Sequence, residues 1–251
     1  MDNYKSLLSK DFSEAADIYN KYANLQHDVA YNLVISNTNQ IEKSNTILDI
    51  GCGTGFIGTE IKNLYPEKTI IQSDIATKMA ILAHEKNLIP TFISDMEKLP
   101  LSQKTIDMVI SSLAIQWGNL EYILSSIRNI IKDTGYVLLS SITNNSFNEI
   151  KTTNPDFSFE KALSYEEMEN ICINSNINNL HVTTYTIKQE FENLKDFFIT
   201  LKNIGARKKT HKNSAYLGKK FFNDMESKYH SLFPENKTYT ISWEIAVIKN
   251  F

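Results

Sequence analysis

The sequence predicts an α/β fold built on a doubly wound, mostly parallel sheet of seven strands, with helices before the first strand and an insertion after the fifth. Two observations predict this fold. Short apolar runs alternate with helical patterns between residues 46 and 143, which is typical of repeated strand–helix units. The first apolar run, residues 46–50, passes directly into a glycine-rich turn and a helix, as in sheets that bind ligands at the carboxyl ends of their strands.

The residues up to 143 divide into alternating helices and strands. Residues 11–36 carry apolar side chains at three- and four-residue steps, so we expect one long helix there. Each later apolar run is short enough to be a buried strand. Strands are expected at 46–50, 68–74, 90–95, 105–116 and 136–143, and helices at 55–65, 76–87 and 119–135, the last closed by Gly135.

The pattern changes after residue 143. Residues 143–156 are mostly polar and are expected to form a loop. Ser164 and Glu167 form a capping box, which predicts that a helix begins at residue 165. A strand is expected at 181–191, a helix at 194–206 that ends at Gly205, and a long last strand at 238–250, antiparallel to its neighbours. No linker rich in Pro or Gly separates this half, so we expect residues 1–251 to form a single domain.

The composition is that of an ordinary globular protein and argues against several classes. The formal net charge is -3 over 251 residues, so nothing points to a nucleic-acid partner. No apolar run reaches the length of a membrane span, and the N-terminus lacks a signal-peptide pattern, so we expect a cytoplasmic protein with no membrane partner. The two cysteines and five histidines lack the spacing of metal ligands, so we expect no metal. We expect a monomer.

The glycine-rich turn contains a literal GxGxxG at residues 53–58, the pattern of a dinucleotide site. That match is two residues out of register, because the strand runs straight into Gly51 and the turn then reads Gly51, Gly53, Gly55. Asp49 lies inside the end of the strand, where a carboxylate would repel a pyrophosphate and attract an ammonium or sulfonium group. Both features oppose a nicotinamide-dependent dehydrogenase and favour S-adenosylmethionine (SAM).

Two more acids follow the next two strands. Asp74 ends the second strand, where it could accept hydrogen bonds from both ribose hydroxyls of either NAD or SAM. Asp95 ends the third strand, where its carboxylate or a neighbouring backbone group could accept the exocyclic amine of adenine. The combination of these acids with the glycine turn is more specific than any one of them.

On these motifs, residues 46–143 resemble a class I SAM-dependent methyltransferase, whose fold is Rossmann-like. Residues 12–30, 111–117, 201–207 and 238–248 further resemble the malonyl-[acyl-carrier protein] O-methyltransferases of biotin synthesis, so the resemblance covers nearly the whole chain. One departure is the turn at 132–135, where the family usually has Lys-Pro-Gly-Gly. The resemblance implies lid helices at 1–40, a SAM-binding core at 46–143 and a substrate-side insertion with C-terminal strands at 144–251.

The resemblance implies transfer of a methyl group from SAM to the free carboxylate of a malonyl thioester on acyl carrier protein. A carboxylate is already ionised near pH 7, so the site needs orientation and no acid/base pair. Residues implied to orient the substrate are Tyr19, Gln116, Trp117, Ser141 and Arg207. Residues implied to bind the cofactor are Gln26, Asp49, Gly51, Gly53, Gly55, Asp74, Ile75, Met79, Asp95, Met96 and Leu113.

Plainer structural roles stay open for several of these residues. Trp117 could be a core residue, and Tyr22, beside Tyr19, is expected to be one. The segment 201–220 contains seven Lys or Arg and no acid, so it is either a solvated face or a dock for an acidic carrier protein. The candidate docking residues are Lys202, Arg207, Lys208, Lys209 and Lys212.

Two other functions compete within the same fold. One is a class I methyltransferase that acts on another small acid. The other is a non-biosynthetic relative that assists assembly of respiratory complex I. That branch usually carries His before the Trp, where this chain has Gln116.

Overall fold

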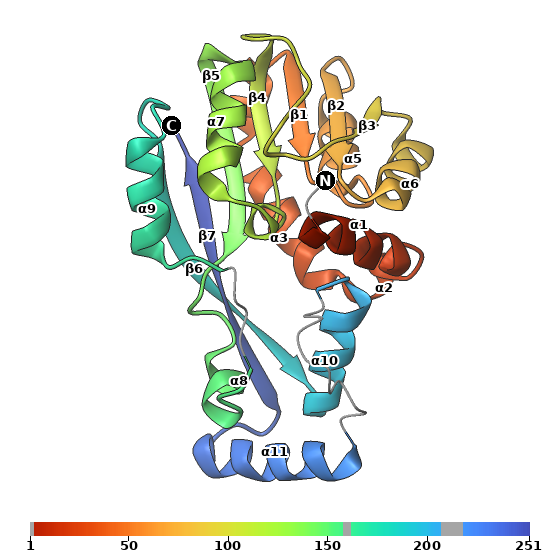
Figure 1. Cartoon of the computed structure of the whole chain (residues 1–251), viewed down its shortest axis with the longest axis vertical. Coiled ribbons are helices and arrows are strands. Elements are labelled where there is room, and N and C mark those ends of the chain that lie inside the picture. Colours follow the sequence, from red (N-terminus) through yellow and green to blue (C-terminus); the bar gives the residue numbers. More distant parts are fainter. Residues whose placement is uncertain (1–2, 158–161, 207–217) are drawn as a thin grey trace.

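The computed structural model describes residues 3–157, 162–206 and 218–251, and its centre is a mixed seven-stranded sheet (Figure 1). The seven strands agree with the sequence prediction in number and order along the chain. The strands are β1 Thr46–Ile50, β2 Thr69–Asp74, β3 Thr91–Ile93, β4 Ile106–Ser111, β5 Ile131–Ile142, β6 His181–Phe191 and β7 Tyr239–Lys249.

Helices surround the sheet and precede it. Four come before β1: α1 Asn3–Ala15, α2 Tyr19–Tyr22, α3 Asn24–Ile35 and α4 Thr38–Lys43. Those within the parallel half are α5 Phe56–Leu64, α6 Thr77–Asn87, the short 3-10 turn η1 Ile115–Trp117 and α7 Leu120–Ile130. Those of the second half are α8 Asn148–Thr153, α9 Tyr165–Asn174, α10 Leu194–Asn203 and α11 Lys219–Leu232.

The strand order is β3-β2-β1-β4-β5-β7-β6, and the first five strands are parallel. β1 is central in this half and pairs with both β2 and β4. The direction of strand succession reverses between β1 and β4, and in such sheets ligands bind outside the carboxyl ends at that reversal. The glycine turn follows β1 at this place, so the fold puts the predicted motifs at the expected edge.

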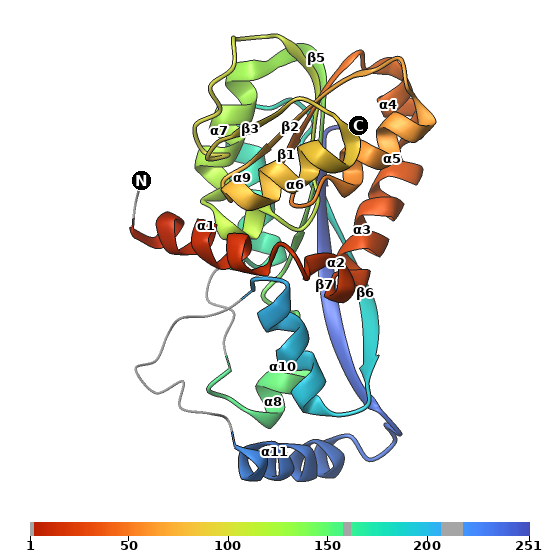
Figure 2. The ribbon, with the colours of Figure 1, turned by 90° about the vertical axis from the view of Figure 1, so that its right-hand side faces the viewer.

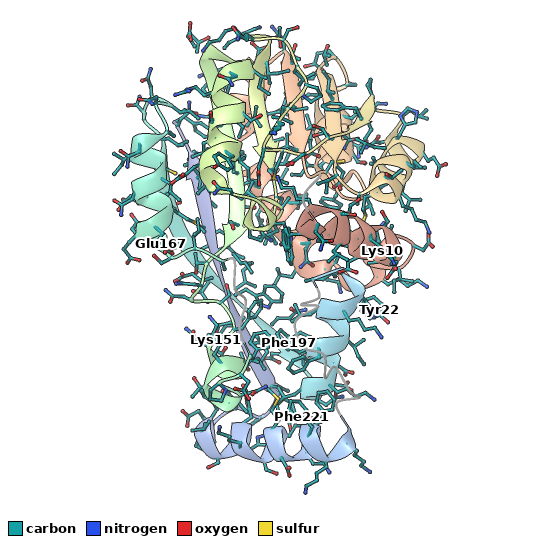
Figure 3. The ribbon with its side chains drawn as sticks, viewed as in Figure 1. Lys10, Tyr22, Lys151, Glu167, Phe197 and Phe221 are labelled. Atoms are coloured by element: carbon teal, nitrogen blue, oxygen red, sulfur yellow. The ribbon has the colours of Figure 1, made fainter. Side chains whose placement is uncertain are left out.

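The last strand, β7, is antiparallel to both of its neighbours, as predicted from the sequence. β7 pairs with β5 on one side and along its whole length with β6 on the other. Strands β6 and β7 run beyond the parallel half into a second lobe, formed by α8, α10, α11 and the ends of β6 and β7 (Figures 1 and 2). We call it the substrate-side lobe after the role that the resemblance predicts for this region. Its core is aromatic: Phe197, labelled in Figure 3, packs against Phe147, Phe191 and Trp243.

The N-terminal region differs from the single helix predicted over residues 11–36. The chain forms α1, α2 and α3 instead, with breaks after Ala15 and at Ala23. Contacts with different partners explain the breaks, because α1 packs on α6 whereas α3 packs on α5. Helices α1 and α2 therefore lie between the parallel half of the sheet and α10 (Figure 2).

Two predicted element ends are wrong. Helix α7 ends at Ile130, and Gly135 lies inside β5 instead of closing the helix. The sheet competes successfully for residues 131–135, because Ile131 already pairs with Ile106 of β4. The fourth strand ends at Ser111, and residues 115–117 turn away from the sheet as η1.

The second half contains a helix in the segment predicted as a loop. Residues 148–153 form α8, which packs on β7 and α11. Glu149 anchors this helix, since its carboxylate accepts hydrogen bonds from the Ser242 hydroxyl at 2.6 Å and the Ser242 amide at 3.0 Å. The capping box at Ser164 and Glu167 is confirmed at the start of α9, and Gly205 has a left-handed φ of 77° just after α10.

Candidate active site

The glycine turn between β1 and α5 has the register predicted from Gly51. Gly51, Gly53 and Gly55 all have positive φ, at 65°, 54° and 76°. A Cβ on Gly51 would lie 2.4 Å from the Ala114 Cβ, so only glycine fits there. A Cβ on Gly53 would meet nothing within 4 Å, so this backbone faces open space where a ligand can approach closely.

Asp49 lies on β1 beneath this turn and is 1% exposed. Its Oδ2 accepts a long hydrogen bond of 3.5 Å from the Gln72 amide, and its Oδ1 has no partner among the described residues. Burial raises the pKa of Asp49 to about 7, although the hydrogen bond from Gln72 lowers it. A buried carboxylate with one vacant oxygen is poised to take a cationic ligand group.

Asp74 ends β2 next to the same turn. Its Oδ2 accepts from the Gly53 amide and its Oδ1 from the Ala76 amide, both at 2.8 Å. Burial raises the pKa of Asp74 to about 6, while these backbone hydrogen bonds lower it. The carboxylate therefore fixes the turn, and the remaining lone pairs are available for the ribose contact predicted from the sequence.

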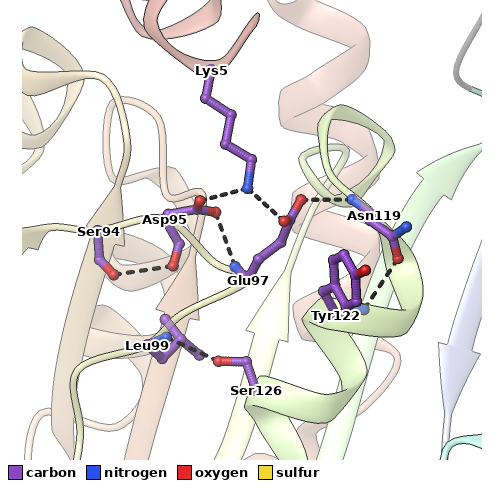
Figure 4. Close-up of polar contacts among 8 residues, drawn as sticks. All are labelled: Lys5, Ser94, Asp95, Glu97, Leu99, Asn119, Tyr122 and Ser126. Carbon is purple, nitrogen blue, oxygen red and sulfur yellow. Dashed lines mark hydrogen bonds and ion pairs between the residues drawn. The ribbon is translucent and has the colours of Figure 1, made fainter. Parts of the chain in front are cut away.

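Asp95 lies two residues beyond β3, so it does not itself end the strand. Figure 4 shows that Lys5 of α1 reaches both Asp95 and Glu97, with Nζ–O distances of 2.5 Å. The other Asp95 oxygen accepts from the Glu97 amide at 3.0 Å. Glu97 in turn accepts from the Asn119 amide, which links this cluster to the start of α7. The expected contact of Asp95 with adenine stays a prediction.

The N-terminal helices touch the cofactor side of the site at three further points. The Ser9 hydroxyl donates to the Ile75 carbonyl at 2.8 Å. The Thr54 hydroxyl, within the glycine turn, donates to the Asn20 side chain at 2.7 Å. Phe12 and Tyr19 pack against a small cluster that contains Met79 of α6. Residues far apart in the sequence thus form a cover over the carboxyl edge.

Leu113 lies in the loop after β4 with a left-handed φ of 49°, which is unusual for a side chain of this kind. Its amide donates to the Ser140 carbonyl at 3.0 Å, and its carbonyl accepts from the Gln116 side chain at 2.7 Å. Strained backbone of this kind is concentrated at functional sites. The short η1 follows, and its Trp117 contacts Phe12 of α1.

A cavity of about 30 Å³ lies between η1, the N-terminal helices and the substrate-side lobe. Four of the predicted polar or aromatic residues line it: Tyr19, Gln26, Gln116 and Trp117. Its other walls are Phe12, Leu113, Ile142, Leu201, Ile204, Ala206 and Trp243. Apart from the Tyr19 phenol, no ionisable side chain among the described residues lines this cavity.

The remaining predicted residues behave differently. Ser141 lies inside β5, and its hydroxyl donates to the Gln116 amide oxygen at 3.4 Å. Desolvation and the nearby Asp74 raise the pKa of the Tyr19 phenol, so its hydroxyl is a neutral donor at pH 7. Gln26, implied as a cofactor residue, lines the same cavity as the substrate candidates. Arg207, Lys208, Lys209 and Lys212 lie outside the described residues.

Sequence reasoning missed several residues of this site. Lys5, Asn20 and Trp243 gave no local signal, because each acts on a partner far away in the sequence. Phe12 meets Trp117 edge to face with ring centroids 5.5 Å apart, a contact that also depends on the fold. Within residues 3–157, 162–206 and 218–251, no group of three or more His, Cys, Asp or Glu is arranged for a metal, and no helix is long and apolar enough to cross a membrane.

Comparisons with known proteins agree with this geometry. A family model described as a methyltransferase domain matches residues 47–135. A SAM-dependent methyltransferase from Archaeoglobus fulgidus superposes with a TM-score of 0.58 at 18% identity, covering 93% of this chain and 98% of that one. Geranyl diphosphate C-methyltransferase from Streptomyces coelicolor, solved with S-adenosyl-L-homocysteine, superposes with a TM-score of 0.50 at 11% identity, covering 85% and 80%. The protein is a class I SAM-dependent methyltransferase.

Sequence comparison narrows the class. A malonyl-[acyl-carrier protein] O-methyltransferase from Bacillus cytotoxicus is 30% identical, covering 80% of this chain and 76% of the relative. The corresponding protein of Bacillus anthracis is 27% identical, covering 80% and 81%. The chain belongs to this family of O-methyltransferases.

The described residues fit SAM, the cofactor of this class. The vacant oxygen of buried Asp49 suits the cationic amino group of SAM, and the turn at Gly53 leaves room for close approach of its backbone. The individual contacts predicted from the sequence stay proposals.

Proposed function

We propose that this protein methylates the free carboxylate of a malonyl thioester carried on acyl carrier protein. The product is a malonyl methyl ester, which primes the synthesis of the pimeloyl chain of biotin. Methylation removes a negative charge that an apolar acyl tunnel of an elongation enzyme would reject at a cost of several kcal/mol. The names of the relatives and the character of the cavity support this proposal.

The observation that carries the proposal is that the described residues lining the cavity are neutral at pH 7. Gln26, Gln116 and Tyr19 offer amide and hydroxyl groups, and the other walls are apolar. Neutral donors can orient a carboxylate without drawing away the electron density with which it attacks. A hydroxyl or amine substrate would need a general base, and no His, Asp, Glu or Lys among the described residues lines this cavity.

When bound, SAM supplies a methyl group on a sulfonium centre, and a carboxylate oxygen replaces the sulfur on that methyl. The protein orients the reacting groups and excludes water, which can lower the barrier by roughly 7–11 kcal/mol in favourable cases. Gln116 is itself held by the Leu113 carbonyl and is within reach of Ser141, so its amide has a fixed direction. Phe12 and Trp117 pack edge to face in the wall of the cavity.

The cavity has room for about one water molecule and not for an acyl group. Binding of a malonyl group therefore requires the N-terminal helices or α10 to move, and we propose that they do. Lys202 lies exposed on the last turn of α10, and its sequence neighbour Leu201 lines the cavity. With the basic residues that follow it in the sequence, Lys202 is the proposed dock for the acidic carrier protein.

The test is to incubate the purified protein with SAM and malonyl-carrier protein and to measure the mass of the acyl group. We expect a mass gain of one CH₂ unit on malonyl-carrier and none on acetyl-carrier, which lacks the free carboxylate. Malonyl-coenzyme A in a parallel reaction shows whether the carrier protein is needed. No gain on any malonyl thioester, with SAM binding intact, would reject the proposal and favour another acid substrate or the assembly-factor role.

A further inference from the structure

Trp243 is buried on strand β7, and it lines the cavity of the candidate active site. It lies on β7 opposite Ile187 of β6, and it is 3% exposed. Its ring packs against Phe147, with centroids 4.5 Å apart and planes at 77°. Trp243 also lines the cavity that Gln26, Gln116 and Trp117 line. It therefore connects the aromatic core of the substrate-side lobe with the site.

The indole N–H of Trp243 has no acceptor among the described residues. A buried donor without an acceptor is rare, because it loses its hydrogen bond to water and gains nothing in return. Its ring neighbours Phe147 and Phe197 contain no acceptor atom in their side chains. Among the described residues, Trp243 borders this cavity, so a group that binds there is a candidate for the missing acceptor.

We propose that the indole N–H of Trp243 donates a hydrogen bond to the malonyl carboxylate and thereby positions it for methylation. This inference rests on the proposed function, and it adds a specificity residue from the last strand, outside the core that carries the cofactor motifs. One carboxylate oxygen accepts this hydrogen bond, and the second oxygen remains free to attack the methyl group.

The chemistry of indole suits this task. Its N–H is a donor only, and it carries no charge at any working pH. A Lys or Arg in this place would bind the carboxylate more tightly but would also hold back the lone pair that attacks. A hydrogen bond between a neutral donor and a carboxylate in a dry site contributes to both affinity and orientation. An acetyl group offers no carboxylate, so Trp243 distinguishes the two thioesters.

The test removes the indole N–H and keeps an aromatic side chain at position 243. The first variant is Trp243→Phe. The second carries benzothienylalanine at position 243, a residue of the same shape as Trp with sulfur in place of the N–H. Binding of malonyl-carrier and acetyl-carrier is measured by competition, and SAM affinity is measured separately. We expect both variants to bind malonyl-carrier about tenfold more weakly, with acetyl-carrier and SAM affinities unchanged.

The matched control is Phe197→Leu, which disturbs the same aromatic cluster without touching the cavity. It should lower the thermal midpoint and leave the ratio of malonyl to acetyl affinity as in the parent. Equal weakening for both thioesters in the Trp243 variants, or no weakening, would overturn the proposal. If the parent protein itself shows no preference for malonyl-carrier, the proposed function fails and the role of Trp243 with it. A preference in the parent that both Trp243 variants retain refutes this inference alone.

Discussion

Asp49 is the residue on which cofactor binding is expected to depend most. Its carboxylate is buried, its Oδ1 has no partner among the described residues, and burial raises its pKa to about 7. A cationic amino group binds the ionised carboxylate better than the protonated acid. SAM affinity should therefore rise with pH, by at most about tenfold per unit, between pH 5.5 and 7, and level off above that. Calorimetric titration at several pH values measures this.

Asp49→Asn removes the titrating group and keeps its shape. We expect this variant to bind SAM weakly at every pH, with most of the pH dependence below 7 lost. Asp133→Asn is a suitable control, because Asp133 is exposed and pairs only with Lys104 among the described residues. A wild-type affinity that stays constant from pH 5.5 to 7.5 would contradict the assigned role of Asp49.

At the residue scale, the predictable part of the site is the part encoded locally. Asp49, the glycine turn and Asp74 lie within or next to their strands, so their positions follow from the strand–turn–helix pattern. Lys5 and Trp243 reach the site from α1 and β7, and no local pattern reveals which side chain will point inward there.

At the scale of elements, α1 covers the cofactor side of the site and is held there by Lys5. The three side chains of this cluster are only 12–24% exposed, so the ion pairs are stronger than typical surface pairs. Lys5→Met should destabilise the closed position of α1 by about 1–2 kcal/mol. The open population would then rise roughly five- to thirtyfold. Hydrogen exchange of the α1 amides measures this directly.

Lys10→Met is the matched control for Lys5. Lys10 is on the same helix but is largely exposed, and its ion pair with Glu14 spans 3.9 Å. Its variant should exchange like the parent. Saturating SAM should protect α1 and the region near Tyr19 in the parent protein. Equal exchange in all three proteins, or no protection by SAM, would show that α1 is not a lid held by Lys5.

Some helices and strands could be predicted from sequence patterns alone, and others could not. Every predicted strand exists, because short apolar runs bounded by turns have few alternatives. The apolar stripe over residues 11–36 was helical as predicted, but tertiary contacts with α5 and α6 broke it into three helices. Gly135 resembled a helix terminator and lies instead in β5, where a Cβ would come within 3.0 Å of the Asp107 carbonyl. Local propensity could not reveal that residues 131–135 belong to strand β5.

For the whole molecule, the two buried carboxylates make stability depend on pH. The pKa values of Asp49 and Asp74 rise from 3.8 to about 7 and about 6 in the folded protein. The unfolded chain therefore releases these protons first as the pH rises. The free energy of unfolding without SAM should fall between about pH 4 and 7, by at most about 1.4 kcal/mol per unit for each carboxylate. Denaturant titrations across this range measure the slope.

Asp49→Asn provides the check on this dependence. Without SAM at pH 7.5 it should be more stable than the parent, because no buried charge forms in the vacant site. Near pH 4 the two proteins should differ little, since Asp49 is then protonated in the folded state. An Asp49→Asn variant that is less stable than the parent at both pH values would contradict the pKa assigned to Asp49.

Carrier docking is the second property of the whole molecule. If the basic segment from Lys202 binds an acidic carrier, added salt should raise the KM for malonyl-carrier and leave SAM affinity nearly unchanged. Lys202→Glu should raise the same KM severalfold. Lys188→Glu, an exposed lysine on β6, serves as the control for charge alone. If neither added salt nor Lys202→Glu changes the KM for malonyl-carrier, the carrier docks elsewhere on the protein.

We expect the cavity, whose lining is neutral over the described residues, to direct the methyl group onto a carboxylate oxygen. The most direct measurement is a single turnover of malonyl-carrier with SAM labelled in its methyl group, followed by mild alkaline hydrolysis of the product. If the product is the methyl ester, hydrolysis releases the label as methanol, and the recovered malonate carries no label. Label retained on carbon as methylmalonate, or no transfer to the acyl group, would contradict the account.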